Sequence, residues 1–158
     1  MESTIRPATA DDAAHLRRLQ TELTEPAPQL LDAAIIQGDT ADGKNTHPQA
    51  ASTAKGFTLL VSVDESNRAV GYLLALTGKT THIAELAVDP KYRRAGRANA
   101  LLGVLIKQAN EPITVHVAVD NTAARTLYGT VGFQEQRRRD DQFEHAAGLT
   151  LRYPSAER

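Results

Sequence analysis

The spacing of apolar residues along the chain predicts an alternation of strands and helices. Helical spacing occurs in four stretches, at 13–23, 29–37, 96–106 and 121–131. Strand-like patterns occur at 3–6, 57–63, 69–77, 80–88, 113–119, 133–139 and 149–153. Gly38 and Gly132 mark the expected ends of the second and fourth helices, because glycine readily adopts the left-handed conformation that stops a helix.

The connections between these elements predict a sheet with both antiparallel and parallel pairs. Short turns separate the strands at 57–63, 69–77 and 80–88, which predicts an antiparallel meander. The helix at 96–106 then lies between two strands, and such a crossover unit makes its strands parallel and close neighbours. The polar stretch 38–55 is a long loop, either incidental or a lid over a site.

The turn before the third helix is the strongest local signal for a binding site. The strand ends at Glu85-Leu86-Ala87-Val88, Asp89-Pro90 breaks it, and the basic, glycine-containing stretch 93–98 leads into the helix. The first N–H groups of a helix have no intrahelical partner and carry the positive end of its dipole. This turn is therefore predicted to bind an anion such as a phosphate group.

Composition limits the class of protein. The 158 residues suit one domain, and 19 acidic against 18 basic residues give a formal net charge of -1, so nothing global indicates a nucleic-acid partner. The absence of cysteine excludes disulfides, thiolate metal sites and a cysteine nucleophile. No signal peptide or membrane-spanning segment is recognisable, so we expect a soluble cytoplasmic protein without a membrane partner.

Three landmarks in the sequence resemble the GNAT superfamily of N-acetyltransferases. Its pyrophosphate signature, Arg or Gln, two residues, Gly, one residue, Gly or Ala, is matched by the stretch 93–98. Asn121 is followed seven residues later by Tyr128 and then by Gly-Phe, as is usual in the family. The third landmark is the order of elements, and the resemblance extends over nearly the whole chain.

The resemblance implies a fold and a cofactor site. It implies an α/β (α+β) fold in one domain, 1–158, with a GNAT-like mixed, mostly antiparallel sheet of about seven strands and about four flanking helices. A central V-shaped splay would separate the strand ending at Val88 from the strand beginning at Ile113 and hold acetyl-CoA. The implied cofactor-binding residues are Leu86, Ala87, Val88, Arg93, Arg94, Ala95, Gly96, Arg97, Ala98, Asn99 and Asn121. The alternative for Arg97 is that its side chain points to solvent.

Catalysis by such an enzyme needs an acid, and a base for the attacking amine. The resemblance places Tyr128 where the family protonates the sulfur of coenzyme A, whereas the alternative is a core aromatic. For the base, Glu85 ranks slightly above His116, and both rank above His82. Histidine suits the task because its ordinary pKa is about 6.5, although a structural role for each histidine is an equal alternative.

The sequence thus predicts transfer of an acetyl group from acetyl-CoA to a primary amine of a small molecule, peptide or protein, without a metal. The alternative is a non-catalytic acyl-CoA-binding or sensing module. The acceptor amine is not identifiable, and a homodimer is possible because relatives often form one. The basic run Arg137–Arg139 is interpreted as an exposed strand end rather than a nucleic-acid patch.

Overall fold

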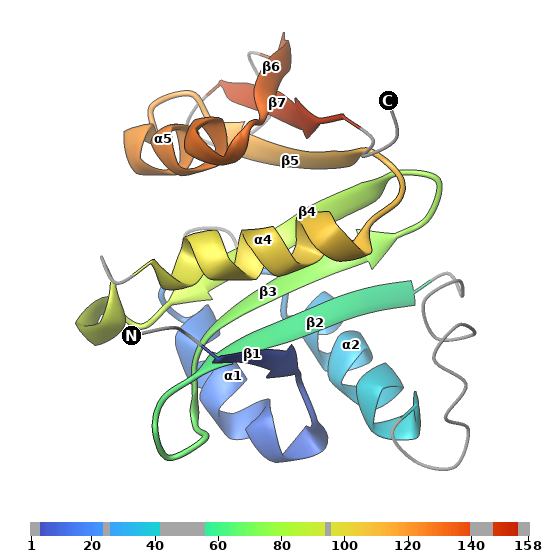
Figure 1. Cartoon of the computed structure of the whole chain (residues 1–158), viewed down its shortest axis with the longest axis vertical. Coiled ribbons are helices and arrows are strands. Elements are labelled where there is room, and N and C mark those ends of the chain that lie inside the picture. The colour runs from blue at the N-terminus through green and yellow to red at the C-terminus, as the bar shows by residue number, and fades with distance from the viewer. Residues whose placement is uncertain (1–3, 24–25, 42–55, 94–95, 140–146, 155–158) are drawn as a thin grey trace.

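A seven-stranded sheet runs through the molecule and carries helices on both faces (Figure 1). The computed structural model describes residues 4–23, 26–41, 56–93, 96–139 and 147–154. The strands are β1 (Thr4–Pro7), β2 (Gly56–Val63), β3 (Ala69–Thr77), β4 (Thr81–Val88), β5 (Ile113–Ala118), β6 (Gln134–Arg139) and β7 (Gly148–Tyr153). Their order in the sheet is β1-β2-β3-β4-β5-β7-β6, and every neighbouring pair is antiparallel except β4 and β5. This mixed sheet confirms the predicted fold class.

Four α-helices lie in the described part of the chain. They are α1 (Ala13–Gln20), α2 (Pro28–Ala41), α4 (Arg97–Gln108) and α5 (Thr122–Val131), with short 3-10 turns at Ala10–Asp12 and Pro90–Tyr92. The prediction that α2 ends near Gly38 is wrong, since the helix continues to Ala41. A glycine inside a helix costs only about 1 kcal/mol and does not by itself end it. The rest of the predicted polar loop, 42–55, lies outside the described residues.

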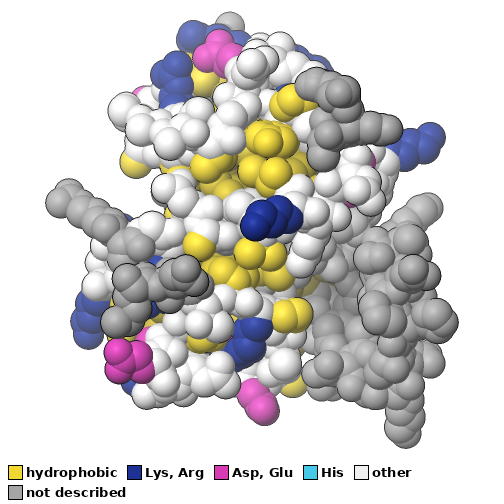
Figure 2. Space-filling model, in the orientation of Figure 1, with side chains coloured by type: hydrophobic (Ala, Val, Ile, Leu, Met, Phe, Trp, Pro, Cys, Tyr) yellow, Lys and Arg dark blue, Asp and Glu magenta, His cyan; other side chains and the backbone are white. Residues whose placement is uncertain are grey.

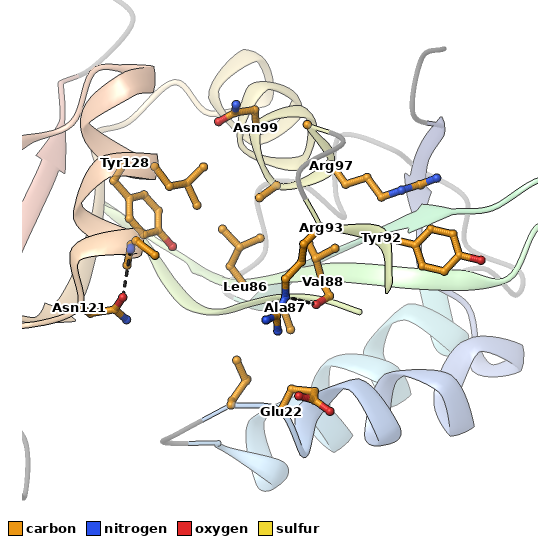
Figure 3. A pocket seen from close by; sticks show the side chains of 16 residues that line it. Glu22, Leu86, Ala87, Val88, Tyr92, Arg93, Arg97, Asn99, Asn121 and Tyr128 are labelled. Atoms are coloured by element: carbon orange, nitrogen blue, oxygen red, sulfur yellow. Dashed lines mark hydrogen bonds between the residues drawn. The ribbon is translucent and has the colours of Figure 1, made fainter. Parts of the chain in front are cut away.

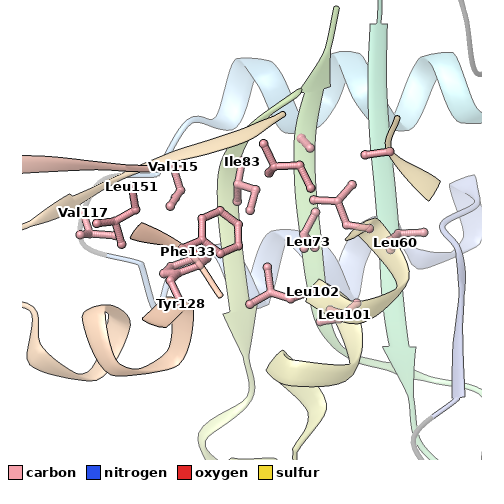
Figure 4. Close-up of a cluster of buried hydrophobic side chains, with 14 of the residues drawn as sticks. Leu60, Leu73, Ile83, Leu101, Leu102, Val115, Val117, Tyr128, Phe133 and Leu151 are labelled. Carbon is pink, nitrogen blue, oxygen red and sulfur yellow. The ribbon is translucent and has the colours of Figure 1, made fainter. Parts of the chain in front are cut away.

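Apolar side chains pack on the two faces of the sheet in two clusters. One cluster joins α4 and α5 to the sheet, and Figure 4 labels several of its residues, among them Leu73, Ile83 and Leu102. The other joins α1 and α2 to β2, β3 and β4 on the opposite face, with Leu16 and Tyr72 fully buried in it. Because side chains alternate along a strand, a polar side chain points either toward α4 and α5 or toward α1 and α2.

The central feature of the sheet is the short ladder between β4 and β5. Only Thr81, His82 and Ile83 of β4 pair with β5, opposite Ile113, Thr114 and Val115. Beyond Ile83 the two strands separate, as Figure 1 shows on the side where α4 begins. This is the predicted V-shaped splay. None of the described helices is long and apolar enough to cross a membrane, and the cytoplasmic location stays a prediction.

Candidate active site

A cleft of about 500 Å³ opens where β4 and β5 separate (Figure 3). Its walls come from β4, the turn before α4, the start of α4, α5 and the residues that directly follow α1. Figure 2 shows apolar side chains at the surface along the boundary between the part made by α5 with β5–β7 and the part around α4. The cleft is lined by Glu22, Leu23, Leu86, Ala87, Val88, Tyr92, Arg93, Gly96, Arg97, Ala98, Asn99, Asn121, Ala123, Ala124, Leu127 and Tyr128.

The end of β4 forms one wall of this cleft. Residues 86–88 pair with β3 on one side, whereas the β4–β5 ladder has already ended at Ile83 on the other. The side facing the cleft is therefore a strand edge inside the sheet, with backbone groups directed toward the space between the strands. Arg93 reaches back to this edge and donates from Nε to the Val88 carbonyl over 3.0 Å.

The turn before α4 has the features of an anion site. Gly96 is the N-cap of α4 and has a φ of +81°, in the left-handed region that favours glycine. A Cβ built on Gly96 would have no neighbour within 4 Å, so the space beside it is open. The N–H of Ala100 donates to the Gly96 carbonyl. The N–H groups of 97–99 precede this bond, so they have no acceptor within the helix. Arg94 and Ala95 lie outside the described residues.

Arg97 lines the cleft, but its side chain is directed toward β2. Its Nη1 donates to Ser62 Oγ over 2.8 Å and to the Val63 carbonyl over 3.0 Å. The guanidinium also lies over the Tyr92 ring, 5.1 Å from its centroid. The alternative of a side chain in solvent is therefore wrong. The Arg97 side chain thus ties the first turn of α4 to β2.

Tyr128 reaches the cleft from α5, and Figure 3 shows its hydroxyl directed between α5 and β4. The residue is 4% exposed, and its ring packs edge-on against Phe133 at a centroid distance of 5.2 Å. Burial raises the pKa of the Tyr128 phenol above its ordinary value of 10, so the hydroxyl keeps its proton near neutral pH. Asn121 caps the same helix, since its Oδ1 accepts from the Ala124 N–H over 3.0 Å.

Glu85 lies on the other face of β4, buried at 3% exposure and outside the residues that line the cleft. Its carboxylate accepts four hydrogen bonds. Gln20 Nε2 donates to both oxygens over 3.0 and 2.9 Å, the Tyr72 hydroxyl donates over 2.8 Å, and the Ala27 N–H donates over 2.6 Å. Ala27 immediately precedes α2, so the carboxylate also lies at the positive end of that helix.

His82 and His116 lie side by side at the point where the splay begins, and like Glu85 they are not among the residues that line the cleft. Their ring centroids are 4.7 Å apart, and their Nδ1 atoms are hydrogen-bonded to Thr114 Oγ1 at 2.9 Å and Thr150 Oγ1 at 3.0 Å, respectively. Burial is the largest cause that lowers the pKa of each histidine. The neighbouring His116 adds to this for His82, and Arg137 and Arg139 add to it for His116. Both imidazoles are therefore neutral near pH 7.

Comparison with known proteins decides the family of this chain. A model of the acetyltransferase (GNAT) family matches residues 17–133, which is most of the sequence. This chain belongs to the GNAT family. The GNAT chain is 32% identical over 139 residues to a mycothiol acetyltransferase of Clavibacter michiganensis. That match covers 83% of this chain and 44% of the relative, so the chain spans less than half of the relative's length.

Solved structures share the GNAT fold over nearly the whole chain. Arabidopsis thaliana NAA60 in complex with acetyl-CoA matches with a TM-score of 0.76 at 15% identity, covering 97% of this chain and 98% of that one. The ribosomal-protein-S18-alanine N-acetyltransferase of Escherichia coli matches with a TM-score of 0.73 at 18% identity, covering 98% and 94%. These similarities agree with the sheet order and the splay described above.

Three residues that position site groups in this GNAT chain were not predicted from its sequence. Gln20 and Tyr72 hold Glu85, and Thr150 holds His116. Each is an ordinary polar residue within a helix or strand, and its partner lies 13 to 65 residues away. All three residues are at most 7% exposed. The burial of a single polar residue cannot be predicted from the local spacing of apolar residues. In the described part of the chain no three histidine or acidic side chains converge on a possible metal position.

Proposed function

We propose that this chain is an N-acetyltransferase that transfers the acetyl group of acetyl-CoA to a primary amine. The observation that carries the proposal is the cleft itself, which brings a strand edge, an anion-binding turn and a protonated phenol together. Membership of the GNAT family, and the mycothiol acetyltransferase among its relatives, support this choice. Because the chain spans less than half of that relative, the proposal concerns the reaction and does not extend to the relative's substrate.

The residues of the cleft suit acetyl-CoA. The edge of β4 at 86–88 offers backbone groups that can pair with the amides of the pantetheine arm, as a neighbouring strand would. The open space beside Gly96 and the N–H groups at the start of α4 suit the pyrophosphate. Asn121 uses its Oδ1 to cap α5, so its Nδ2 is the atom that can donate to the arm from the opposite wall.

Tyr128 is the proposed general acid. Acetyl-CoA supplies a thioester, and when the amine nitrogen takes over the acetyl group the C–S bond breaks and leaves a thiolate that needs a proton. The raised pKa keeps the Tyr128 hydroxyl protonated until that moment, and the thiolate then receives its proton. The packing of the ring against Phe133 fixes the direction of the hydroxyl.

His116 is the proposed general base in place of Glu85. It is the first residue of β5 beyond the ladder with β4, so it stands where the strands separate. Its Nδ1–H can donate to Thr150 Oγ1, which leaves the lone pair of Nε2 to accept a proton from the amine. Three donor groups make four hydrogen bonds to the carboxylate of Glu85, which supports a structural role for that residue.

The test is steady-state acetylation of a panel of primary amines by the wild type and by Tyr128→Phe. The variant keeps the ring and removes the proton, so kcat is expected to fall by about 100-fold or more at a little-changed KM for acetyl-CoA. Tyr153→Phe is the matched control, because the ring of Tyr153 also contacts Phe133 but does not line the cleft.

Two results would contradict the proposal. Undiminished turnover by Tyr128→Phe would remove Tyr128 as the acid. Tight binding of acetyl-CoA in calorimetry, without transfer to any amine or to proteins of a lysate, would instead favour a non-catalytic acyl-CoA-binding module.

A further inference from the structure

We propose that the acceptor amine carries an anionic group, a carboxylate or a phosphate, and that Arg137 and Arg139 on β6 bind it. The proposal rests on the acetyltransferase function proposed above and names the chemical class of its acceptor. Its basis is the placement of three side chains across β5, β7 and β6.

The registers of these strands place His116 and Arg137 in one row. His116 is opposite Thr150 of β7, and Thr150 is opposite Arg137 of β6. Residues directly opposite one another in neighbouring strands point to the same face of a sheet. Arg139 is two residues further along β6 and lies on this face as well, because side chains alternate along a strand.

The side chains of β7 show on which face of the sheet the row of His116, Thr150 and Arg137 lies. Leu149 and Leu151 are buried in the cluster with α4 and α5, so Thr150 faces the opposite way, toward the side on which α1 and α2 lie. Arg138, which is opposite Leu149, accordingly faces the α5 side. Glu135 also lies on the α5 side, since it is opposite Leu151 and pairs with Arg125 of α5 at 3.5 Å.

The face with Arg137 and Arg139 is therefore positively charged next to the proposed base. Both arginines are exposed, as is every residue of β6, and Arg152 points to the same face one row away. The described strands carry two carboxylates, of which Glu85 is buried among its own donors and Glu135 lies on the other face. The lowered pKa of His116 is consistent with these two cations.

Such a surface would repel a simple alkylammonium ion, which is the form in which most amines reach the protein. An anionic group on the acceptor reverses this, because the arginines then attract the molecule and bind the group with charge-assisted hydrogen bonds. β5 and β6 are two strand spacings apart, about 10 Å, and an arginine side chain covers part of that distance. The anionic group should thus be separated from the amine by a few bonds.

The test compares acceptors that differ in the anionic group. The carboxylate arm uses 4-aminobutyrate against 4-aminobutanamide, and the phosphate arm uses phosphoethanolamine against ethanolamine. We expect a higher kcat/KM for the anionic member of at least one pair. In Arg137→Gln and in Arg139→Gln this preference should fall by about tenfold. Arg138→Gln, on the same strand but the opposite face, is the matched control and should keep the preference.

A second measurement separates failure of this proposal from failure of the proposed function. NMR titration of the His116 imidazole in the wild type, with glutarate or inorganic phosphate as the probe, needs no turnover. An anion bound at the two arginines should raise the pKa of His116, and the shift should disappear in the Arg137→Gln, Arg139→Gln double variant. Turnover of amines with no charge preference, and no shift with either probe, would overturn this proposal alone. Absence of turnover with every amine would overturn the acetyltransferase function, and the titration would still decide whether the anion site exists.

Discussion

At the scale of single residues, the proposed chemistry depends on keeping two groups in opposite protonation states. Tyr128 must hold its proton and His116 must lack one, both near neutral pH. Burial keeps both groups uncharged near neutral pH, because it disfavours the charged form of each group. For His116 the cations Arg137 and Arg139 act in the same direction, so removing either should be visible in the pH dependence.

The activity should therefore fall on the acidic side with an inflection below the ordinary histidine pKa of about 6.5. Below that inflection His116 is protonated and cannot accept the proton of the amine, whereas above it the imidazole is neutral and kcat/KM no longer depends on its protonation. Arg137→Gln removes a cation, raises the pKa of His116 and should move the inflection to higher pH. The measurement is the pH profile of kcat/KM for the acceptor, which reports the pKa of His116 before the acceptor binds.

Arg138→Gln is again the control for this profile, since Arg138 faces away from His116. His82 lies against His116 and also titrates, so His82→Gln is measured in parallel. An inflection that does not move in Arg137→Gln would argue against His116 as the base.

At the scale of elements, Glu85 connects parts of the chain that are distant in sequence. Its carboxylate receives donors from α1, from β3 and from the residue before α2. These contacts hold the two helices against the face of β4, next to the residues after α1, Glu22 and Leu23, that line the cleft. Glu85 is thus a positioning residue for one wall of the site.

Glu85→Ala should lower the free energy of unfolding by about 3 kcal/mol, because it leaves the Gln20 amide, the Tyr72 hydroxyl and the Ala27 N–H buried without their acceptor. Urea denaturation measures this change. Glu65→Ala, at an exposed turn, is the control and should change the free energy by less than about 0.5 kcal/mol. A variant at Glu85 as stable as the wild type would show that the four hydrogen bonds contribute little.

The elements themselves could be predicted from the sequence to within a residue or two in most cases. The strand, turn and helix over 81–108 were readable because apolar spacing, Asp89-Pro90 and Gly96 are all local signals. The end of α2 was not, since a glycine is a weak stop that the surrounding helix overrides. The hydrogen bond from Gln20 to Glu85 was not predictable either, because the two residues are 65 positions apart and no local pattern connects them.

At the scale of the whole molecule, the sheet consists of two parts joined at one short ladder. β1–β4 form one part and β5–β7 the other, and three residue pairs connect them. A ligand in the cleft would contact β4 and α4 on one side and α5 on the other. Binding should therefore stabilise the molecule as a unit.

Coenzyme A at about 100 times its Kd should add about 2.7 kcal/mol to the free energy of unfolding and raise Tm by about 5–10 °C. Gly96→Glu should abolish this rise, because it places a carboxylate where the pyrophosphate is proposed to lie. Gly96→Ala introduces the same backbone strain at a φ of +81° without a charge, and its Cβ would meet open space. We expect it to lower Tm without ligand and to keep most of the rise, as thermal unfolding can measure.

The location of the cleft could be predicted at this scale, whereas the face proposed to receive the acceptor could not. The cleft follows from a motif and a crossover unit that are continuous in sequence. The acceptor side depends on the registers of β5, β7 and β6, which bring Arg137 into the row of His116. The sequence alone predicted that the run Arg137–Arg139 is an exposed strand end, and its exposure is confirmed. The sequence did not show that Arg137 shares a face of the sheet with His116.

The two outer strands also limit how copies of this chain can associate. β6 is exposed along its whole length and carries three successive arginines, while β1 has four residues and ends at Pro7. Like charges and a proline at a sheet edge discourage pairing with the edge of another sheet. Neither end of this sheet therefore favours extension into a continuous sheet across two molecules, and a homodimer of this chain should use helices or loops as its contact surface.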